Sequence, residues 1–189
     1  ERIFKYIGAE EVNSNPRHEN SRYIIDFFDM PLKREKSLTP FSSISYAERR
    51  DCIISGIVPS DYPMNVAYDW PDLARIIEDK VKPNRQNQER KALRERWWQY
   101  AEKRPGLYSE IRSKPRVFVT SAAAVMHHMI ACLPSDMVYS HKLIVFARSE
   151  FKFFSFIQSR LHEIWSRYFG TTIGSVDAVT YTPTQVFET

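Results

Sequence analysis

The feature that most constrains this chain is a stretch of eight residues, 84–91, that contains no apolar side chain. Burying it would leave polar groups without partners, so it must stand in water. Apolar residues at three- and four-residue spacing precede it in 73–81 and follow it in 93–101. The pattern predicts a helix that begins at Pro71, and then a second helix whose first half stands free of the core.

The rest of the chain is apolar enough to fold. Hydrophobic residues make up 43% and aromatic residues 14% of its 189 positions, which fits a globular protein and argues against disorder. This length suits one domain with a sizeable core or two small lobes. No apolar run approaches the roughly 20 residues of a membrane helix. We therefore expect no membrane partner. The two cysteines make no disulfide framework, so we expect a cytoplasmic protein.

The remaining periodic segments predict an α+β fold. A short helix is expected from Pro105, and Ser149 is expected to cap a long helix that runs to about Phe169. Strands are expected over 23–28, 116–120, 126–133, 137–147 and 176–181, the third and fourth joined as a hairpin by a turn at 134–136. We therefore expect a twisted, mostly antiparallel sheet packed by the long C-terminal helix, with a helical arm.

Two segments receive more specific expectations. Residues 31–68 are weakly patterned, with Ser, Pro and Gly scattered through them, and we interpret them as an irregular insertion. The long C-terminal helix is expected to face the core with a stripe of apolar residues at three- and four-residue spacing. That stripe comprises Phe154, Ile157, Leu161, Ile164, Trp165 and Tyr168.

Several segments together carry a family resemblance through their order and spacing. They are ERIFKYIGAEEVN at 1–13, KVKPNRQNQERKALRERWWQYAEKRPGLYSEI at 80–111, YSHKLIVFA at 139–147, FIQSRLHEIWSRYFG at 156–170 and YTPTQVFET at 181–189. The chain resembles the target-recognition domain of MmeI-like DNA methyltransferases, a group that includes restriction–modification enzymes and phage-defence methyltransferases. The resemblance covers most of the chain apart from about 31–68.

The resemblance implies a role within a larger enzyme. Residues 1–189 would be the DNA target-recognition domain, a fragment of a bacterial or archaeal adenine-N6 DNA methyltransferase. Its partners would be double-stranded DNA and the methyltransferase domain of the same chain, which would bind SAM. The sequence has neither the Asn/Asp-Pro-Pro-aromatic loop nor the Gly-rich loop of such enzymes, so we expect no catalysis here. The alternative is a protein–protein interaction module of a multi-subunit defence system, which the aromatic-rich composition suits as well.

The basic stretch around 80–96 supplies candidate phosphate contacts. Acidic residues interleave with the basic ones, which also fits an ordinary solvated helix face. Given the resemblance, we favour Lys82, Arg85 and Arg90 because their half of the helix lacks apolar anchoring. Trp97 and Trp98 are adjacent and cannot share one helix face, and core packing is the favoured role for such residues over base stacking.

The expected hairpin supplies candidate base-reading residues, because strands can enter a DNA groove. These candidates are Ser121, His127, His128, Ser140 and Lys142. Lys142 interrupts an apolar strand, which is costly unless its charge reaches solvent or a ligand. The alternative is that Lys142 extends to water at a sheet edge. Adjacent histidines on a strand would point to opposite faces and no zinc-motif spacing is present, so we expect no metal site.

Overall fold

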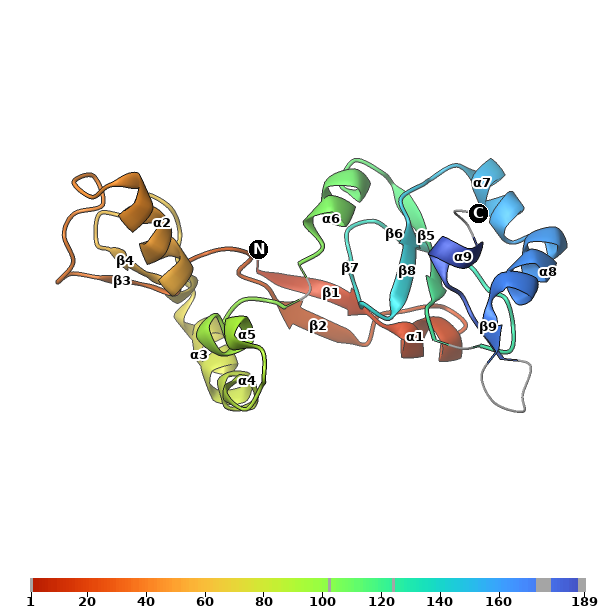
Figure 1. Ribbon diagram of the computed structural model, residues 1–189, viewed down its shortest axis with the longest axis horizontal. Coiled ribbons are helices and arrows are strands. Elements are labelled where there is room, and N and C mark those ends of the chain that lie inside the picture. Colours follow the sequence, from red (N-terminus) through yellow and green to blue (C-terminus); the bar gives the residue numbers. More distant parts are fainter. Residues whose placement is uncertain (1, 102, 124, 173–177, 187–189) are drawn as a thin grey trace. The chain divides into compact units, whose positions relative to one another are not determined.

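The computed structural model describes residues 2–101, 103–123, 125–172 and 178–186. The chain divides into two compact units, and Figure 1 shows the elements of each. The first unit comprises Glu1–Ile3 and Ile25–Lys103, and the second comprises Phe4–Ile24 and Arg104–Thr189. Helices alternate with small sheets in which most strand pairs are antiparallel, so the predicted mixed α+β class is confirmed. The single sheet packed by a long helix is not observed.

The first unit contains a parallel strand pair with a helix between its strands. β3 (Lys33–Glu35) pairs with β4 (Ile57–Pro59), and α2 (Tyr46–Ser55) connects them. The Ser45 hydroxyl accepts the backbone N–H of the third residue of α2, which closes a capping box. The expectation of irregular structure over 31–68 is therefore wrong for these elements. The capping signal starts a helix that a weak apolar pattern does not reveal.

The core of the first unit is formed around α3 (Pro71–Lys80), which begins at the predicted proline. Its buried side chains are Ala74 and Ile77. They share a cluster with Phe27, Trp97, Trp98 and the first residue of the 3-10 helix η1 (Ala67–Asp69). Gly56 ends α2 with φ 82°, and a Cβ there would lie 2.3 Å from the Trp98 ring. Core packing is thus confirmed for both tryptophans.

The segment between α3 and these tryptophans is not one helix. It forms α4 (Lys82–Gln86) and α5 (Lys91–Glu95), joined by 87–90. The predicted continuous helix is wrong. Residues 87–90 are exposed rather than packed in the core, so nothing offsets the entropy lost when they are ordered as a helical turn. The predicted exposure is confirmed, since none of the side chains of 84–91 is buried.

The second unit is centred on a three-stranded antiparallel sheet. β5 (Arg116–Ser121) lies between β6 (Ala131–Pro134) and β8 (Leu143–Phe146). Phe118 packs in one apolar cluster, and the valines on either side of it pack in another. Both faces of β5 are therefore covered, which explains why its sequence is apolar rather than alternating.

The hairpin expected across 134–136 is wrong. After the turn, β7 (Val138–Tyr139) pairs in parallel with β1 (Ile3–Ile7) rather than with β6. The backbone N–H of Tyr139 donates to the Tyr108 hydroxyl at 3.1 Å. Such long-range partners, which no local turn signal contains, decide the pairing.

The N-terminal part of the second unit is fixed by a buried carboxylate. Glu11 in α1 (Ala9–Ser14) is buried and accepts two hydrogen bonds of 2.7 Å from the guanidinium of Arg22, the first residue of β2 (Arg22–Ile25). This charge-assisted pair lowers the pKa of Glu11 to about 2. β2 neighbours β1 in the sheet that also contains β7.

The long C-terminal helix is also wrong. The chain forms α7 (Phe151–Ile157) and α8 (Arg160–Phe169) instead. The hydroxyl of Ser159 caps α8 by accepting the backbone N–H of its third residue at 3.2 Å. At the start of α7 the N-cap is Glu150 rather than the predicted Ser149, and it makes no side-chain capping bond.

The remaining elements are short. The predicted α6 (Pro105–Ile111) is observed, β9 (Thr171–Thr172) pairs antiparallel with β10 (Val179–Thr180), and α9 (Pro183–Val186) follows. The strand expected over 176–181 lies partly outside the described residues. None of the helices within the described part of the chain combines the length and apolarity needed to cross a membrane.

Candidate nucleic-acid interface

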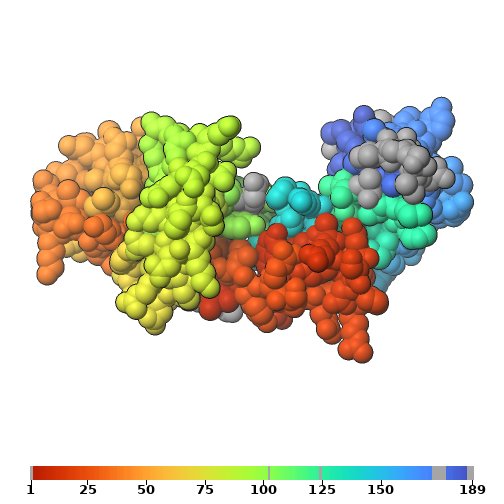
Figure 2. Space-filling view, turned by 90° about the horizontal axis from the view of Figure 1, so that it is seen from below, coloured from red at the N-terminus to blue at the C-terminus, as the bar shows by residue number. Residues whose placement is uncertain are grey.

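The first candidate surface is the basic arm, defined here as residues 82–96, which contains α4 and α5. Its side chains include six lysines and arginines against two glutamates. Because the whole chain has a net charge of +4, the residues outside the arm are neutral on balance. Figure 2 shows this yellow-to-green part of the chain on the surface. The arm therefore concentrates the positive charge of the protein on one exposed segment.

The arginines and lysines of the arm are not equivalent. Lys82 donates to Glu78 at 2.7 Å and lies 4.8 Å from the ring of Trp97, so it stabilises the fold. Arg94 donates to two backbone carbonyls of the 87–90 connection. The side chains of Arg85 and Arg90, in contrast, make no hydrogen bond or ion pair with any residue that the structure describes. These two side chains are available to a ligand.

The second candidate surface is the turn between β7 and β8, in the second unit. The predicted strand over 137–147 breaks here, so Lys142 lies in an exposed turn and not within a strand. The Ser140 hydroxyl accepts the Lys142 backbone N–H at 3.2 Å, and the Lys142 carbonyl accepts the Ala122 N–H at 2.9 Å. The charge of Lys142 thus reaches solvent on a turn of defined shape.

Ser140 builds this turn, and Ser121 lies beside it at the end of β5, where it pairs with Leu143. Ser140 and Ser121 are both buried, and the Ser121 hydroxyl accepts the backbone N–H of Ala123 at 3.1 Å. Behind the turn, the half-buried guanidinium of Arg104 donates to the carbonyls of Ser140 and Leu143 at 3.4 and 3.5 Å. The structure therefore brings Ser121, Ser140 and Lys142 together. A role of either serine in reading bases stays a prediction, since each hydroxyl accepts a backbone N–H of its own segment.

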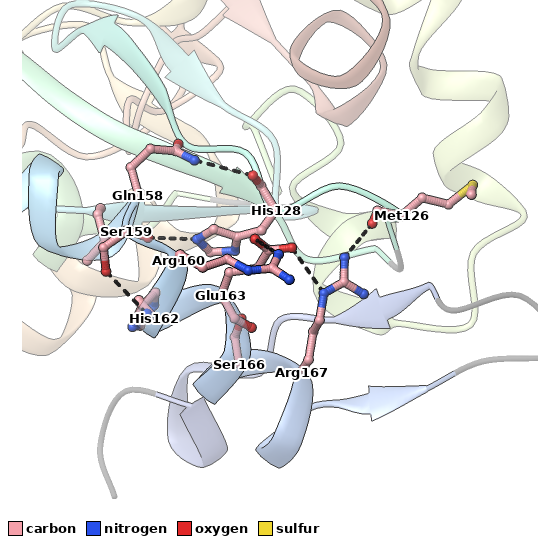
Figure 3. Close-up of polar contacts among 10 residues, drawn as sticks. Met126, His128, Gln158, Ser159, Arg160, His162, Glu163, Ser166 and Arg167 are labelled. Carbon is pink, nitrogen blue, oxygen red and sulfur yellow. Dashed lines mark hydrogen bonds and ion pairs between the residues drawn. The ribbon is translucent and has the colours of Figure 1, made fainter.

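The two histidines lie outside any strand, because β6 begins only at Ala131 and the strand expected over 126–133 is shorter than predicted. His127 is exposed. His128 is half-buried, and its Nε2 donates to the Ile157 carbonyl at 2.6 Å. Its own carbonyl accepts the Gln158 side chain at 3.3 Å, as Figure 3 shows. His128 is therefore occupied in attaching its own segment to the joint between α7 and α8, residues 157–159, and its predicted DNA contact has no free ring Nε2 to use.

The polar contacts at the joint between α7 and α8 continue as a network of ion pairs along α8 (Figure 3). Glu163 pairs with Arg160 at 2.7 Å and with Arg167 at 3.1 Å, and these two arginines lower its pKa. Arg167 also donates to the Met126 carbonyl at 2.7 Å. These contacts attach α8 to the 126–130 segment through polar groups.

The apolar side of α8 is exposed, which the sequence did not predict. The buried residues of α8 are His162 and Ser166. Leu161 and Tyr168 of the expected core stripe are 79% and 82% exposed, and Ile164 and Trp165 are also exposed. The stripe was correctly located as an amphipathic face, but its assignment to the core is wrong for α8.

The described residues include a buried pair of titratable side chains, His162 and Tyr181. Among the described residues, no group of three His, Cys, Asp or Glu side chains is placed to hold a metal ion. His162 shares a 2.8 Å hydrogen bond with the Tyr181 hydroxyl, but both are buried within an aromatic cluster. Burial lowers the pKa of His162 and raises that of Tyr181, so both are held neutral.

No protein-family model matches this chain, no curated protein matches it, and no solved structure matches its fold. The geometry of the two surfaces, together with the resemblance carried by the sequence, is the basis for the assignment of function.

Proposed function

We propose that this chain is the sequence-specific double-stranded DNA recognition module of a SAM-dependent adenine-N6 DNA methyltransferase that acts in restriction–modification or phage defence. The observation that carries the DNA-binding part is the concentration of positive charge on the exposed basic arm, with Arg85 and Arg90 unpaired within the described residues. Duplex DNA carries a regular array of phosphates, and cationic side chains that neutralise them supply most sequence-independent affinity. The methyltransferase part rests on the family resemblance.

In this proposal the two surfaces do different work. Arg85 and Arg90 contact phosphates, which positions a protein on the duplex but carries no sequence information. Lys142 reads base edges, because a lysine on a fixed turn can donate to the O6 and N7 of guanine in the major groove. The target adenine is flipped into the methyltransferase domain of the same chain, which holds SAM.

The test is a selection of duplexes from a random pool by the purified chain at low salt, followed by sequencing. We expect one short motif to be enriched. The double variant Arg85→Gln/Arg90→Gln should weaken binding to every sequence and reduce the slope of log affinity against log salt by about two units. The matched control, Arg17→Gln/Arg50→Gln, removes two exposed arginines outside the arm and should leave that slope unchanged. A slope that the arm variant does not alter would contradict the proposed phosphate contacts.

The proposed base-reading role has its own test. Lys142→Ala should change or abolish the enriched motif, while Arg85→Ala should preserve the motif and lower affinity uniformly. An unchanged motif in the Lys142 variant would exclude Lys142 as a reader. Incubation of the chain alone with SAM and DNA should produce no methylation, because the catalytic loops are missing from its sequence; methyl transfer would contradict the module assignment.

The exposed stripe of α8 favours a second candidate, a protein–protein interaction module. Leu161, Ile164, Trp165 and Tyr168 present apolar surface along one helix, and an exposed patch of this kind marks interaction sites. Salt distinguishes the candidates. DNA affinity falls steeply as ionic strength rises, whereas binding through an apolar protein interface changes little. A chain that fails to bind DNA at low salt but is captured by a defence subunit would favour the second candidate.

A further inference from the structure

On the exposed surface of the first unit, Arg94 contacts the backbone of the 87–90 connection. Its Nη1 donates to the carbonyl of Gln88 at 2.6 Å and to the carbonyl of Glu89 at 2.7 Å. These carbonyls belong to the 87–90 connection between α4 and α5. One guanidinium therefore bonds two consecutive peptide groups of a connection whose side chains are all exposed.

Apolar packing does not account for the shape of this connection. Residues 84–91 contain no apolar side chain, and α4 and α5 contain no buried residue. A short helix without tertiary contacts is unstable in water. Besides a backbone bond from the Gln88 N–H to the Arg85 carbonyl, the two bonds from Arg94 hold this connection, and bonds from a charged donor are about twice as strong as neutral ones.

Arg90 lies directly after the two carbonyls that Arg94 binds. It is the N-cap residue of α5, with extended backbone (φ −69°, ψ 110°), and its carbonyl accepts the N–H groups of Leu93 and Arg94. The backbone of Arg90 is therefore fixed on one side by α5 and on the other by the Arg94 bonds. Its side chain is exposed and unpaired within the described residues.

We propose that Arg94 is a positioning residue that preorganises the 87–90 connection so that Arg90 meets a phosphate of duplex DNA. This inference rests on the proposed function, and it adds a division of roles within the arm. Arg94 directs its Nη1 to the protein backbone, whereas the Arg90 side chain has no polar partner among the described residues and can bind the ligand. Preorganisation of this kind raises affinity because a bound loop does not have to be ordered at the moment of binding.

The test is a double-mutant cycle on affinity for a short fluorescent DNA duplex at low salt. Arg94→Gln should weaken binding about fivefold in the unaltered background, but much less in the Arg90→Gln background, because residues that act through one loop are energetically coupled. Arg75→Gln is the matched control: it removes an exposed arginine of neighbouring α3 that makes no hydrogen bond or ion pair with any described residue. Its effect should be equal in both backgrounds. Additive losses for Arg94 and Arg90 would overturn the positioning role.

A second measurement does not depend on DNA. Hydrogen exchange of the amides in 87–91 should become faster in Arg94→Gln and stay unchanged in Arg75→Gln, with the melting temperature of the chain unchanged in both. Unchanged exchange in the Arg94 variant would overturn the positioning role even if DNA binds. Failure of the unaltered chain to bind DNA would instead overturn the proposed function, and with it the phosphate contact assigned to Arg90.

Discussion

The α4–α5 joint and the α7–α8 joint connect pairs of short helices by opposite means. The first is exposed and depends on one arginine that binds backbone carbonyls. The second is partly buried, and the Gln158 side chain accepts from the Ile130 N–H at 2.8 Å and donates to the His128 carbonyl. Change at the first joint should alter what the surface binds, whereas change at the second should alter whether the unit folds. The difference shows how one chain can separate binding from stability.

The largest effect on stability should come from Trp98, which follows the basic arm in sequence and packs in the core of the first unit. Trp98→Ala removes a buried ring that covers Gly56 and donates to the Met30 carbonyl at 2.9 Å. We expect a loss of about 3–5 kcal/mol in the free energy of unfolding, measured by urea denaturation. Trp165→Ala is the matched control, because Trp165 is 45% exposed and leaves no closed cavity; its loss should be less than half as large. Equal losses would mean that the arm lacks a core anchor.

The contributions of the two joints to stability can be compared by replacing one glutamine in each. Gln158→Ala leaves the N–H of buried Ile130 without a partner, which should cost about 1–3 kcal/mol in unfolding free energy. Gln88→Ala removes an exposed side chain at the other joint and should change that free energy by less than about 0.5 kcal/mol. Equal effects of the two substitutions on urea denaturation would erase the proposed distinction between the joints.

The elements that could be predicted from the sequence are those whose signals are local. Pro71 and Pro105 start helices where expected, and β5 appears where its apolar run lies. The α7–α8 break was missed because the apolar period continues across Ser159, which caps α8, and because the contact of Gln158 with Ile130 is distant in sequence. Local patterns cannot contain such partners.

The candidate site, too, could be predicted only where its signal is local. Composition located the basic arm, since charge needs no partner to be recognised in a sequence. The separate roles of its members could not be predicted, because Arg94 differs from Arg90 only in the carbonyls that it contacts. The exposed face of α8 was also missed, since an amphipathic period shows that a helix has two sides but does not show which side meets the core.

The buried joint should also respond to pH. Burial, and secondly the neighbouring His128, lower the pKa of His162 in the folded protein. Below the ordinary value of about 6.5, the unfolded chain takes up a proton that the folded chain does not bind. The free energy of unfolding should therefore be level above that pH and fall as the pH drops below it. His162→Gln should flatten this fall, while the same change at exposed His127 should leave it intact. A fall that persists in the His162 variant would place its source elsewhere.

The smallest effect distinguishes two cations of the arm that the sequence treats alike. Lys82 pairs with Glu78 across one helical turn and lies over Trp97, whereas the Arg85 side chain has no polar partner among the described residues. Lys82→Gln should lower the free energy of unfolding by about 0.5 kcal/mol, and less in high salt, because ion pairs that solvent reaches are weak and screened. Arg85→Gln should leave stability unchanged but weaken DNA binding more than Lys82→Gln does. The reverse ranking in binding would mean that the Glu78 pair opens for the ligand, and that internal pairing does not decide which cations of the arm contact DNA.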